Sequence, residues 1–140
     1  MTTVSELMRP HVLLVDDNEA MLTRASAVLR GTCTIVGTVR DGRAAIDAAA
    51  EVQPDVIVLD ISMPNMTGLE VAAFLRDSGS TAAVVFLTVH EEDEFVAVAR
   101  DVGGLGYVVK PRLAIDLVQA VRDVYAGRSF VSPPSRFPKL

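Results

Sequence analysis

Cysteine is almost absent from the sequence, which limits the chemistry open to the chain. Cys33 is the single cysteine among 140 residues. One cysteine permits neither an internal disulfide nor a cysteine-based metal cluster. Because Cys33 lies between Thr32 and Thr34, we interpret it as a small packing residue rather than a reactive thiol.

The sequence also lacks long apolar runs and an excess of basic residues. No run approaches the length needed to cross a bilayer, and the opening MTTVSELMRP lacks the basic and apolar regions of a signal peptide. We therefore expect a soluble cytoplasmic domain without membrane contact. With 13 basic and 18 acidic residues the net charge is −5, which argues against direct nucleic-acid binding by this chain.

What the sequence does contain is enough apolar material for one folded domain. Half of the residues, 50%, are hydrophobic, so a disordered chain is not expected. A length of 140 residues is ordinary for a single domain.

Short β-rich runs alternate five times with helical periodicity. The expected strands cover residues 12–15, 35–39, 56–59, 83–87 and 107–109. Apolar residues at helical spacing follow each run, and we expect Asp41 and either Thr67 or Gly68 to begin two of the helices. Gly127 is expected to end the last helix.

This alternation predicts an α/β fold with a doubly wound parallel sheet, because each crossover between parallel strands must be right-handed and covered by a helix. The first, third and fourth runs are unbroken and apolar, as central strands require. The second run contains polar residues and the fifth is short, so both suit the edges. We therefore predict the flavodoxin-like (βα)5 order 2-1-3-4-5.

Polar residues follow four of the five expected strands. Asp16 and Asp17 follow the first, Asp60 the third, Thr88 the fourth and Lys110 the fifth. Ligands of doubly wound sheets bind beyond the carboxyl ends of the strands, so we expect these five side chains to converge at one edge.

Each of these residues also has an ordinary structural interpretation. Asp16 or Asp17 could cap the first helix, Asp60 could be a turn residue, and Thr88 and Lys110 could be a strand end and a solvated charge. As a group they suggest more, because three carboxylates placed close together repel one another unless a cation lies between them. Since all the ligand atoms would be oxygens, the cation that fits most simply is Mg²⁺. Aspartate beside Mg²⁺ and a lysine is well placed to attack phosphorus.

The spacing of these residues resembles the receiver domain of bacterial two-component response regulators. The matching pieces are VDD at 15–17, LDISMPNMTGLE at 59–70, LT at 87–88 and GYVVKP at 106–111. The resemblance covers about residues 10 to 126. It implies a phosphorylation-operated signalling domain rather than a conventional enzyme, one that catalyses only its own phosphorylation and dephosphorylation.

The resemblance also implies a role for each site residue. Asp60 would accept a phosphoryl group from a sensor histidine kinase. Asp16, Asp17, the Asp60 carboxylate and the backbone carbonyl of Ser62 would hold Mg²⁺. Lys110 would pair with the phosphoryl oxygens, Thr88 would move to contact them, and Tyr107 would be the aromatic switch.

Two further expectations concern the Lys110–Pro111 bond and Tyr107. The resemblance implies that the bond is cis and that this aims Lys110 into the site. We also expect that phosphorylation draws Thr88 inward, so that the Tyr107 ring turns from a solvent-facing position into the space beneath the following segment. The changed surface would then bind a partner, either a second copy of the domain or an output module.

The stretch AVRDVYAGRSFVSP resembles the end of receivers of the NarL/FixJ subfamily, in which a helix-turn-helix DNA-binding domain follows. Residues 127–140 are too few for such a domain. We therefore expect an N-terminal extension at 1–10, a receiver domain at 11–126 and a tail or start of a linker at 127–140, in a protein of transcriptional signalling.

Three alternatives remain open. A phosphatase of the haloacid dehalogenase type needs a second aspartate two residues after the nucleophile, where this chain has Ser62. The second alternative is a receiver that has lost phosphorylation and serves only for binding, but the acidic residues of the site, Thr88 and Lys110 are all present here. A flavin-binding protein would need a Ser/Thr-rich phosphate loop after the first strand, which the sequence lacks.

Weaker candidates for function lie elsewhere in the chain. Gly103, Gly104 and Gly106 could cradle a phosphate, but they precede a strand, so we expect a turn. His90 with the acidic run 91–94 could hold a metal, but acids also favour the start of a helix. We expect His11 at the surface and interpret Met63 and Met66 as packing and turn residues.

Overall fold

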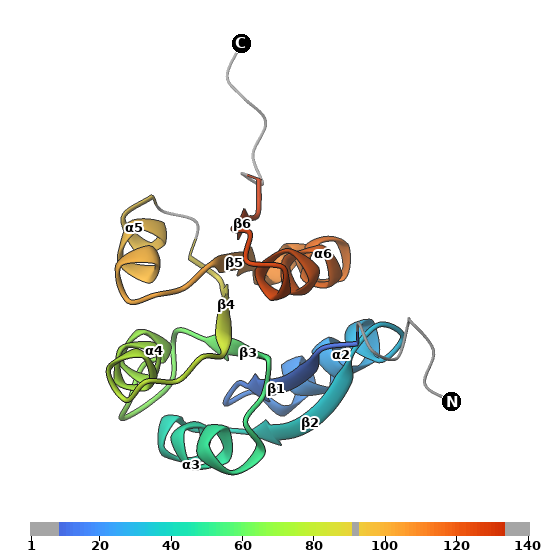
Figure 1. The fold of residues 1–140 in the computed structure, drawn as a ribbon. Helices are drawn as coiled ribbons and strands as arrows, with labels where there is room; N and C mark the ends of the chain where they lie inside the picture. The colour runs from blue at the N-terminus through green and yellow to red at the C-terminus, as the bar shows by residue number, and fades with distance from the viewer. Residues whose placement is uncertain (1–8, 91–92, 134–140) are drawn as a thin grey trace.

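The computed structural model describes residues 9–90 and 93–133, which form a three-layer α/β fold. A central sheet is covered by α2 and α6 on one face and by α3, α4 and α5 on the other (Figure 1). The elements are β1 (His11–Val15), α2 (Glu19–Leu29), β2 (Thr34–Val39), α3 (Gly42–Val52), β3 (Val56–Asp60), α4 (Gly68–Asp77), β4 (Ala83–Thr88), α5 (Asp93–Asp101), β5 (Gly106–Val109), the short 3₁₀ turn η1 (Lys110–Arg112), α6 (Leu113–Tyr125) and β6 (Phe130–Val131).

The strands are parallel and lie in the order β2-β1-β3-β4-β5-β6. The predicted order of the first five strands is therefore confirmed, and so is the flavodoxin-like fold class. Strand β3 lies between β1 and β4 and is buried at all its positions, as its unbroken apolar run predicts.

The sixth strand differs from the prediction. Residues 130–131, which we expected to lie in a tail, pair with β5 in the register Gly106↔Phe130 and Tyr107↔Val131. Strand β5 is therefore not an edge of the sheet, although β2 is. A strand of two residues has no detectable period, and its pairing depends on contacts with residues far away in the sequence.

Capping residues mark the ends of three helices. Asp41 caps α3 by accepting a hydrogen bond from the Ala44 N–H at 2.8 Å, as predicted. Thr67 caps α4 through a reciprocal pair of hydrogen bonds with Glu70, the capping box. Gly127, the second residue after the end of α6, has φ +84°, which agrees with its predicted role as a helix stop.

Two apolar cores pack on the two faces of the sheet. One joins β-strand residues to α2 and α6, and contains Cys33, which is 3% exposed. The other joins the opposite strand residues to α3, α4 and α5, and contains Met63. No helix in residues 9–90 and 93–133 combines the length and apolar character needed to span a bilayer.

The Lys110–Pro111 bond is trans, because residues 9–90 and 93–133 contain no cis peptide bond. The expectation of a cis bond is therefore wrong for this structure. Trans is the lower-energy form of an X–Pro bond, and Pro111 fits within η1 in that form. Lys110 reaches the predicted site without a cis bond.

Candidate functional site

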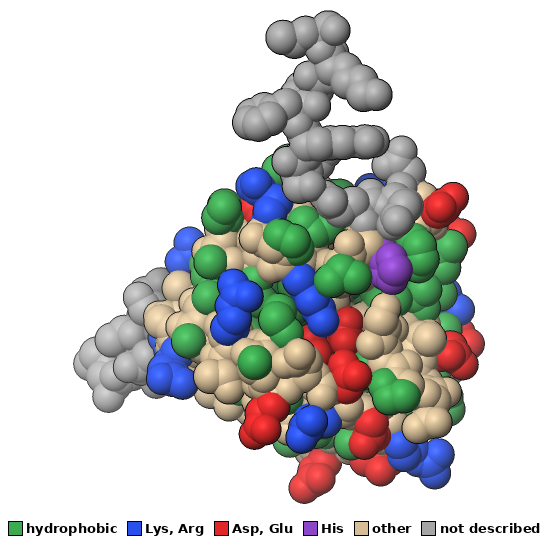
Figure 2. All heavy atoms as spheres, turned by 180° about the vertical axis from the view of Figure 1, so that it is seen from behind, with side chains coloured by type: hydrophobic (Ala, Val, Ile, Leu, Met, Phe, Trp, Pro, Cys, Tyr) green, Lys and Arg blue, Asp and Glu red, His purple; other side chains and the backbone are tan. Residues whose placement is uncertain are grey.

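The carboxyl ends of four strands bring the predicted site residues to one edge of the sheet. Asp16 follows β1, Asp60 ends β3, Thr88 ends β4 and Lys110 follows β5. Figure 2 shows a face of the molecule on which acidic side chains gather near the centre, beside a basic side chain.

Lys110 links the two buried aspartates. Its Nζ lies 3.1 Å from Asp16 Oδ2 and 3.3 Å from Asp60 Oδ1. Asp16, Asp60 and Thr88 are 2%, 2% and 0% exposed, whereas polar side chains usually remain at the surface. Burying two carboxylates is costly, and a single ammonium group offsets part of that cost.

Backbone N–H groups hold both aspartates in place. The Asn18 N–H donates to Asp16 Oδ1 at 2.8 Å, and the Ser62 N–H donates to Asp60 Oδ1 at 3.3 Å. Asn18, not Asp16 or Asp17, caps α2. The interpretation of Asp16 or Asp17 as a helix cap is therefore wrong, and both carboxylates are available for another role.

Gly68 allows the start of α4 to approach Asp60 closely. A Cβ at this position would overlap the backbone carbonyl oxygen of Asp60. The Gly68 N–H donates to the Ile61 carbonyl at 2.9 Å, which holds the turn against the end of β3. The sequence predicted Gly68 only as a possible helix start, since close approach of two backbones leaves no local pattern.

The pKa of Asp60 is raised from 3.8 to about 6, mainly by burial and then by the nearby Asp16 carboxylate. Lys110 and the Ser62 N–H oppose this shift because they stabilise the ionised form. Asp60 is therefore mostly ionised at pH 7 but has a strongly perturbed pKa, as is common for functional carboxylates.

The donor set fits a hard divalent cation. Oxygen atoms of Asp16, Asp17 and Asp60 lie within 4.8 Å of one another, and Asp17 is the most exposed of the three. Asp16 Oδ2 is buried and accepts no well-aligned hydrogen bond from the described residues, although Lys110 lies nearby. A buried carboxylate oxygen without such a partner beside two other carboxylates is suited to bind Mg²⁺.

Thr88 and Tyr107 meet at the segment that follows β4. Thr88 Oγ1 accepts a hydrogen bond from the His90 N–H at 3.1 Å, and the Tyr107 hydroxyl donates to the His90 carbonyl at 2.7 Å. Tyr107 is 3% exposed. The ring is thus already buried in this structure, and the expected solvent-facing position is not observed.

His90 contacts the site in a way that the sequence did not predict. Its Nε2 lies 3.2 Å from Ser62 Oγ, and its ring stacks on Phe95 with centroids 4.2 Å apart and an angle of 7° between the planes. His90 therefore connects the loop after β3 to α5. Residues 91 and 92 of the proposed acidic metal cluster lie outside the described residues.

The remaining weak candidates have structural roles. Gly103 has φ +97°, and a Cβ at Gly104 or Gly106 would collide with Phe86 or Val85. These glycines belong to a turn at the amino end of β5, as expected, and not to the edge that carries Asp60. His11 is exposed at the start of β1 and Met63 is 6% exposed in the core, which agrees with the interpretation of both.

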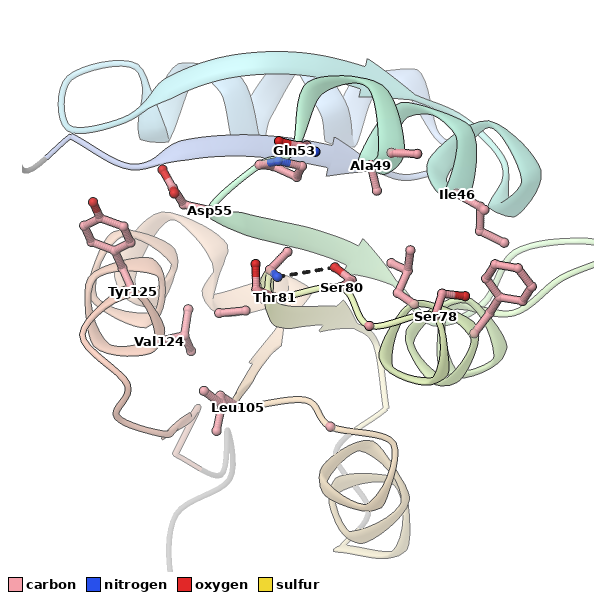
Figure 3. Close-up of a pocket in the computed structure, with 18 of the residues that line it drawn as sticks. Ile46, Ala49, Gln53, Asp55, Ser78, Ser80, Thr81, Leu105, Val124 and Tyr125 are labelled. Carbon is pink, nitrogen blue, oxygen red and sulfur yellow. Dashed lines mark hydrogen bonds between the residues drawn. The ribbon is translucent and has the colours of Figure 1, made fainter.

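A groove of about 850 Å³ lies at the amino ends of the strands, opposite the acidic cluster (Figure 3). Two of its polar side chains already have partners within the fold. Asp55 Oδ2 accepts the His11 N–H at 2.8 Å, and Ser80 Oγ accepts the Ala82 N–H at 3.3 Å. The clustered charge and the perturbed pKa of Asp60 thus lie at the carboxyl edge, as the sequence predicted, and not in this groove.

Comparison with known proteins agrees with this geometry. Residues 12–122 match the family described as the response regulator receiver domain. The chain is 37% identical over 125 residues to the response regulator GacA of Pseudomonas aeruginosa, covering 87% of this chain and 58% of that protein. It is 34% identical over 125 residues to the nitrate/nitrite response regulator protein NarL of Escherichia coli, covering 86% and 57%.

A solved structure shares the fold. The two-component response regulator of the LuxR family from Aurantimonas sp. SI85-9A1 superposes with a TM-score of 0.85 at 28% identity, covering 89% of this chain and 91% of that one. The chain spans somewhat more than half the length of GacA and NarL. Because the family match covers most of the sequence, the chain belongs to the response regulator receiver domains, in their NarL/FixJ subfamily.

Proposed function

We propose that Asp60 accepts a phosphoryl group from a sensor histidine kinase in a reaction that requires Mg²⁺. The observation that carries this proposal is the cluster of Asp16, Asp17 and Asp60 within 4.8 Å, with Lys110 bound to the two buried members. Such a cluster can hold a divalent cation, which together with Lys110 would offset the negative charge of a phosphoryl group.

The transfer follows from the arrangement of the Asp60 carboxylate. Its Oδ1 contacts Lys110 and the Ser62 N–H, which leaves Oδ2 to attack phosphorus. As the new P–O bond forms, the P–N bond of the phosphohistidine breaks, and the leaving imidazole takes a proton from solvent. Because the pKa of Asp60 is about 6, the carboxylate is ionised and nucleophilic at neutral pH.

The other site residues stabilise the transferred group. Lys110 balances its charge, and Thr88 donates a hydrogen bond to a phosphoryl oxygen. Asp16, Asp17, Asp60 and the Ser62 carbonyl would hold the ion; bound Mg²⁺ would neutralise charge on the phosphoryl oxygens. Hydrolysis of the aspartyl phosphate by water in the same site returns the domain to its starting state.

The change at Asp60 is passed to a partner through Thr88 and Tyr107. Both contact the His90 backbone, so movement of Thr88 toward the phosphoryl group changes the packing beneath α5. The candidate partners are a second copy of the domain or an output module. We place the receiver at 11–126, between an extension at 1–10 and a linker that begins within 127–140, in a cytoplasmic protein of transcriptional signalling.

Intact mass after incubation with Mg²⁺ and acetyl phosphate tests this function. We expect the wild-type chain to gain one phosphoryl group and Asp60→Asn to gain none. Asp47→Asn is the matched control, because Asp47 is an exposed aspartate on α3 and its loss should leave the gain unchanged. Omitting Mg²⁺ should abolish the gain.

A labile phosphoryl group on Asp60→Asn at the wild-type extent would contradict the assignment. Steady release of phosphate from a simple phosphate ester by the wild-type chain would instead favour the phosphatase alternative. That alternative lacks a carboxylate at Ser62 to protonate the leaving group.

A further inference from the structure

The C-terminal strand β6 is attached to the domain by few backbone hydrogen bonds. The Phe130 N–H donates to the Leu105 carbonyl at 3.0 Å, and the Ser132 N–H donates to the Tyr107 carbonyl at 2.8 Å. The strand itself contains only 2 residues. A ladder this short is only marginally stable without side-chain contacts.

The Ser132 side chain supplies those contacts. Its hydroxyl donates to Asp116 Oδ2 at 2.8 Å and accepts the Val109 N–H at 3.2 Å. The same carboxylate accepts hydrogen bonds from Arg112 Nε at 2.7 Å and Nη2 at 3.2 Å. Ser132 and Asp116 are 8% and 6% exposed, so this Ser132 cluster (Val109, Arg112, Asp116 and Ser132) is a largely buried, charge-assisted network.

The Ser132 cluster contacts residues on both sides of the site lysine, through the backbone N–H of Val109 and the side chain of Arg112. Val109 directly precedes Lys110, and Arg112 follows it by two residues within η1. The Lys110 ammonium group meanwhile contacts Asp16 and Asp60. A displacement of Lys110 toward a phosphoryl group on Asp60 therefore acts directly on the Val109 N–H and on Arg112.

We propose that the Ser132 cluster is a latch that keeps β6 paired with β5 while Lys110 contacts the unmodified Asp60, and that phosphorylation of Asp60 releases the strand. This inference rests on the proposed phosphoacceptor function. Release would free the chain beyond Val131 and uncover the outer edge of β5, so the latch couples the site to the segment that leaves the receiver.

The coupling must work in both directions, because any effect of a phosphoryl group at Asp60 on the pairing of β6 implies an equal effect of β6 pairing on phosphoryl binding. Loss of the latch therefore favours the form that binds a phosphoryl group.

Hydrogen exchange of the backbone N–H groups of residues 130 and 132, measured by NMR, reports the pairing of β6. Titration with beryllofluoride and Mg²⁺, a phosphoryl analogue, reports the site.

The proteins to compare are the wild type, Ser132→Ala and Ser129→Ala. Ser129 is an exposed serine of the same segment, which makes it the matched control. In the wild type we expect the analogue to speed exchange at both positions by about tenfold. Ser132→Ala should exchange rapidly without the analogue and bind it roughly fivefold more tightly, while Ser129→Ala should match the wild type.

The outcomes separate the latch from the proposed function. Amide shifts at Asp60 and Thr88 report analogue binding itself, and their absence in the wild type would overturn both proposals. Binding with unchanged exchange at residues 130 and 132 would overturn the latch alone. Unchanged amide shifts of β1 and β3 in Ser132→Ala would show that the variant is folded, so that equal analogue affinity in it and the wild type would also overturn the latch.

Discussion

Asp60 is the residue at which folding and function conflict most directly. Its side chain is 2% exposed, and its pKa is raised from 3.8 to about 6, first by burial and then by Asp16. The folded protein therefore holds the Asp60 proton more tightly than the unfolded chain. The stabilisation linked to this proton is fully present below pH 3.8 and is lost as the pH rises through about 6.

From this shift we predict that Asp60→Asn stabilises the protein in a pH-dependent way. Without Mg²⁺, the free energy of unfolding should exceed that of the wild type by about 1 to 3 kcal/mol at pH 8 and differ little at pH 4. Urea unfolding at the two pH values measures this difference. Asp47→Asn should follow the wild type, and a constant difference between Asp60→Asn and wild type at both values would disprove the electrostatic cause.

Cys33 gives a second prediction for a single residue. Burial raises the pKa of its thiol, and the Thr32 hydroxyl and the charges of Arg9 and Arg122 oppose this shift only in part. The thiol should therefore react with a chromogenic disulfide reagent at least about a hundredfold more slowly in the folded protein than in urea. A reaction of the folded protein at the unfolded rate would show that Cys33 is accessible.

At the scale of the secondary-structure elements, α4 is the helix whose first residue packs against the Asp60 backbone. Gly68→Ala would place a methyl group onto the Asp60 carbonyl oxygen, so the helix or the strand must shift. We predict a loss of roughly 1 to 3 kcal/mol in the free energy of unfolding, together with slower phosphorylation of Asp60. Thermal unfolding and intact mass against time measure the two effects.

Gly31→Ala is the control for this experiment. A Cβ at Gly31 would meet nothing within 4 Å, so this variant should be neutral or slightly stabilising. Equal behaviour of Gly31→Ala and Gly68→Ala would mean that the close approach of α4 to Asp60 has no energetic consequence.

The elements also show what the sequence could predict. The first five strands and their order were predicted because buried parallel strands are continuous apolar runs, and Asp60, Thr88 and Lys110 follow from the ends of those strands. Strand β6 and the contact of His90 with Ser62 depend on residues that are distant in the sequence, so no local sequence pattern predicts them. The expected cis form of the Lys110–Pro111 bond is wrong, because it rests on resemblance alone and trans is the lower-energy form of an X–Pro bond.

At the scale of the whole molecule, binding of a metal ion is linked to global stability. A cation that binds only the folded chain stabilises it by about 2.7 kcal/mol when its concentration is 100 times the dissociation constant. We predict that saturating Mg²⁺ raises the melting temperature of the wild type. The effect should be lost in Asp17→Ala, since Asp17 supplies the most exposed of the three carboxylates.

Calorimetry with Mg²⁺ and with an equal ionic strength of Na⁺ separates specific binding from screening of the net charge. Asp77→Ala is a suitable control, because Asp77 is an exposed carboxylate that pairs with Arg76 on α4. A similar rise in Asp17→Ala and wild type would place the ion elsewhere on the surface.

The two outer strands of the sheet have a consequence for the behaviour of the protein at high concentration. β2 carries an irregularity where Val12 pairs with Ile35 but Leu13 pairs with Gly37, and β6 contains only 2 residues. Unpaired sheet edges can recruit strands from other molecules, and bulges and short strands interrupt such recruitment. Neither edge of this sheet is a long, regular strand, so we expect neither edge to promote aggregation of the folded domain by pairing with strands of other molecules.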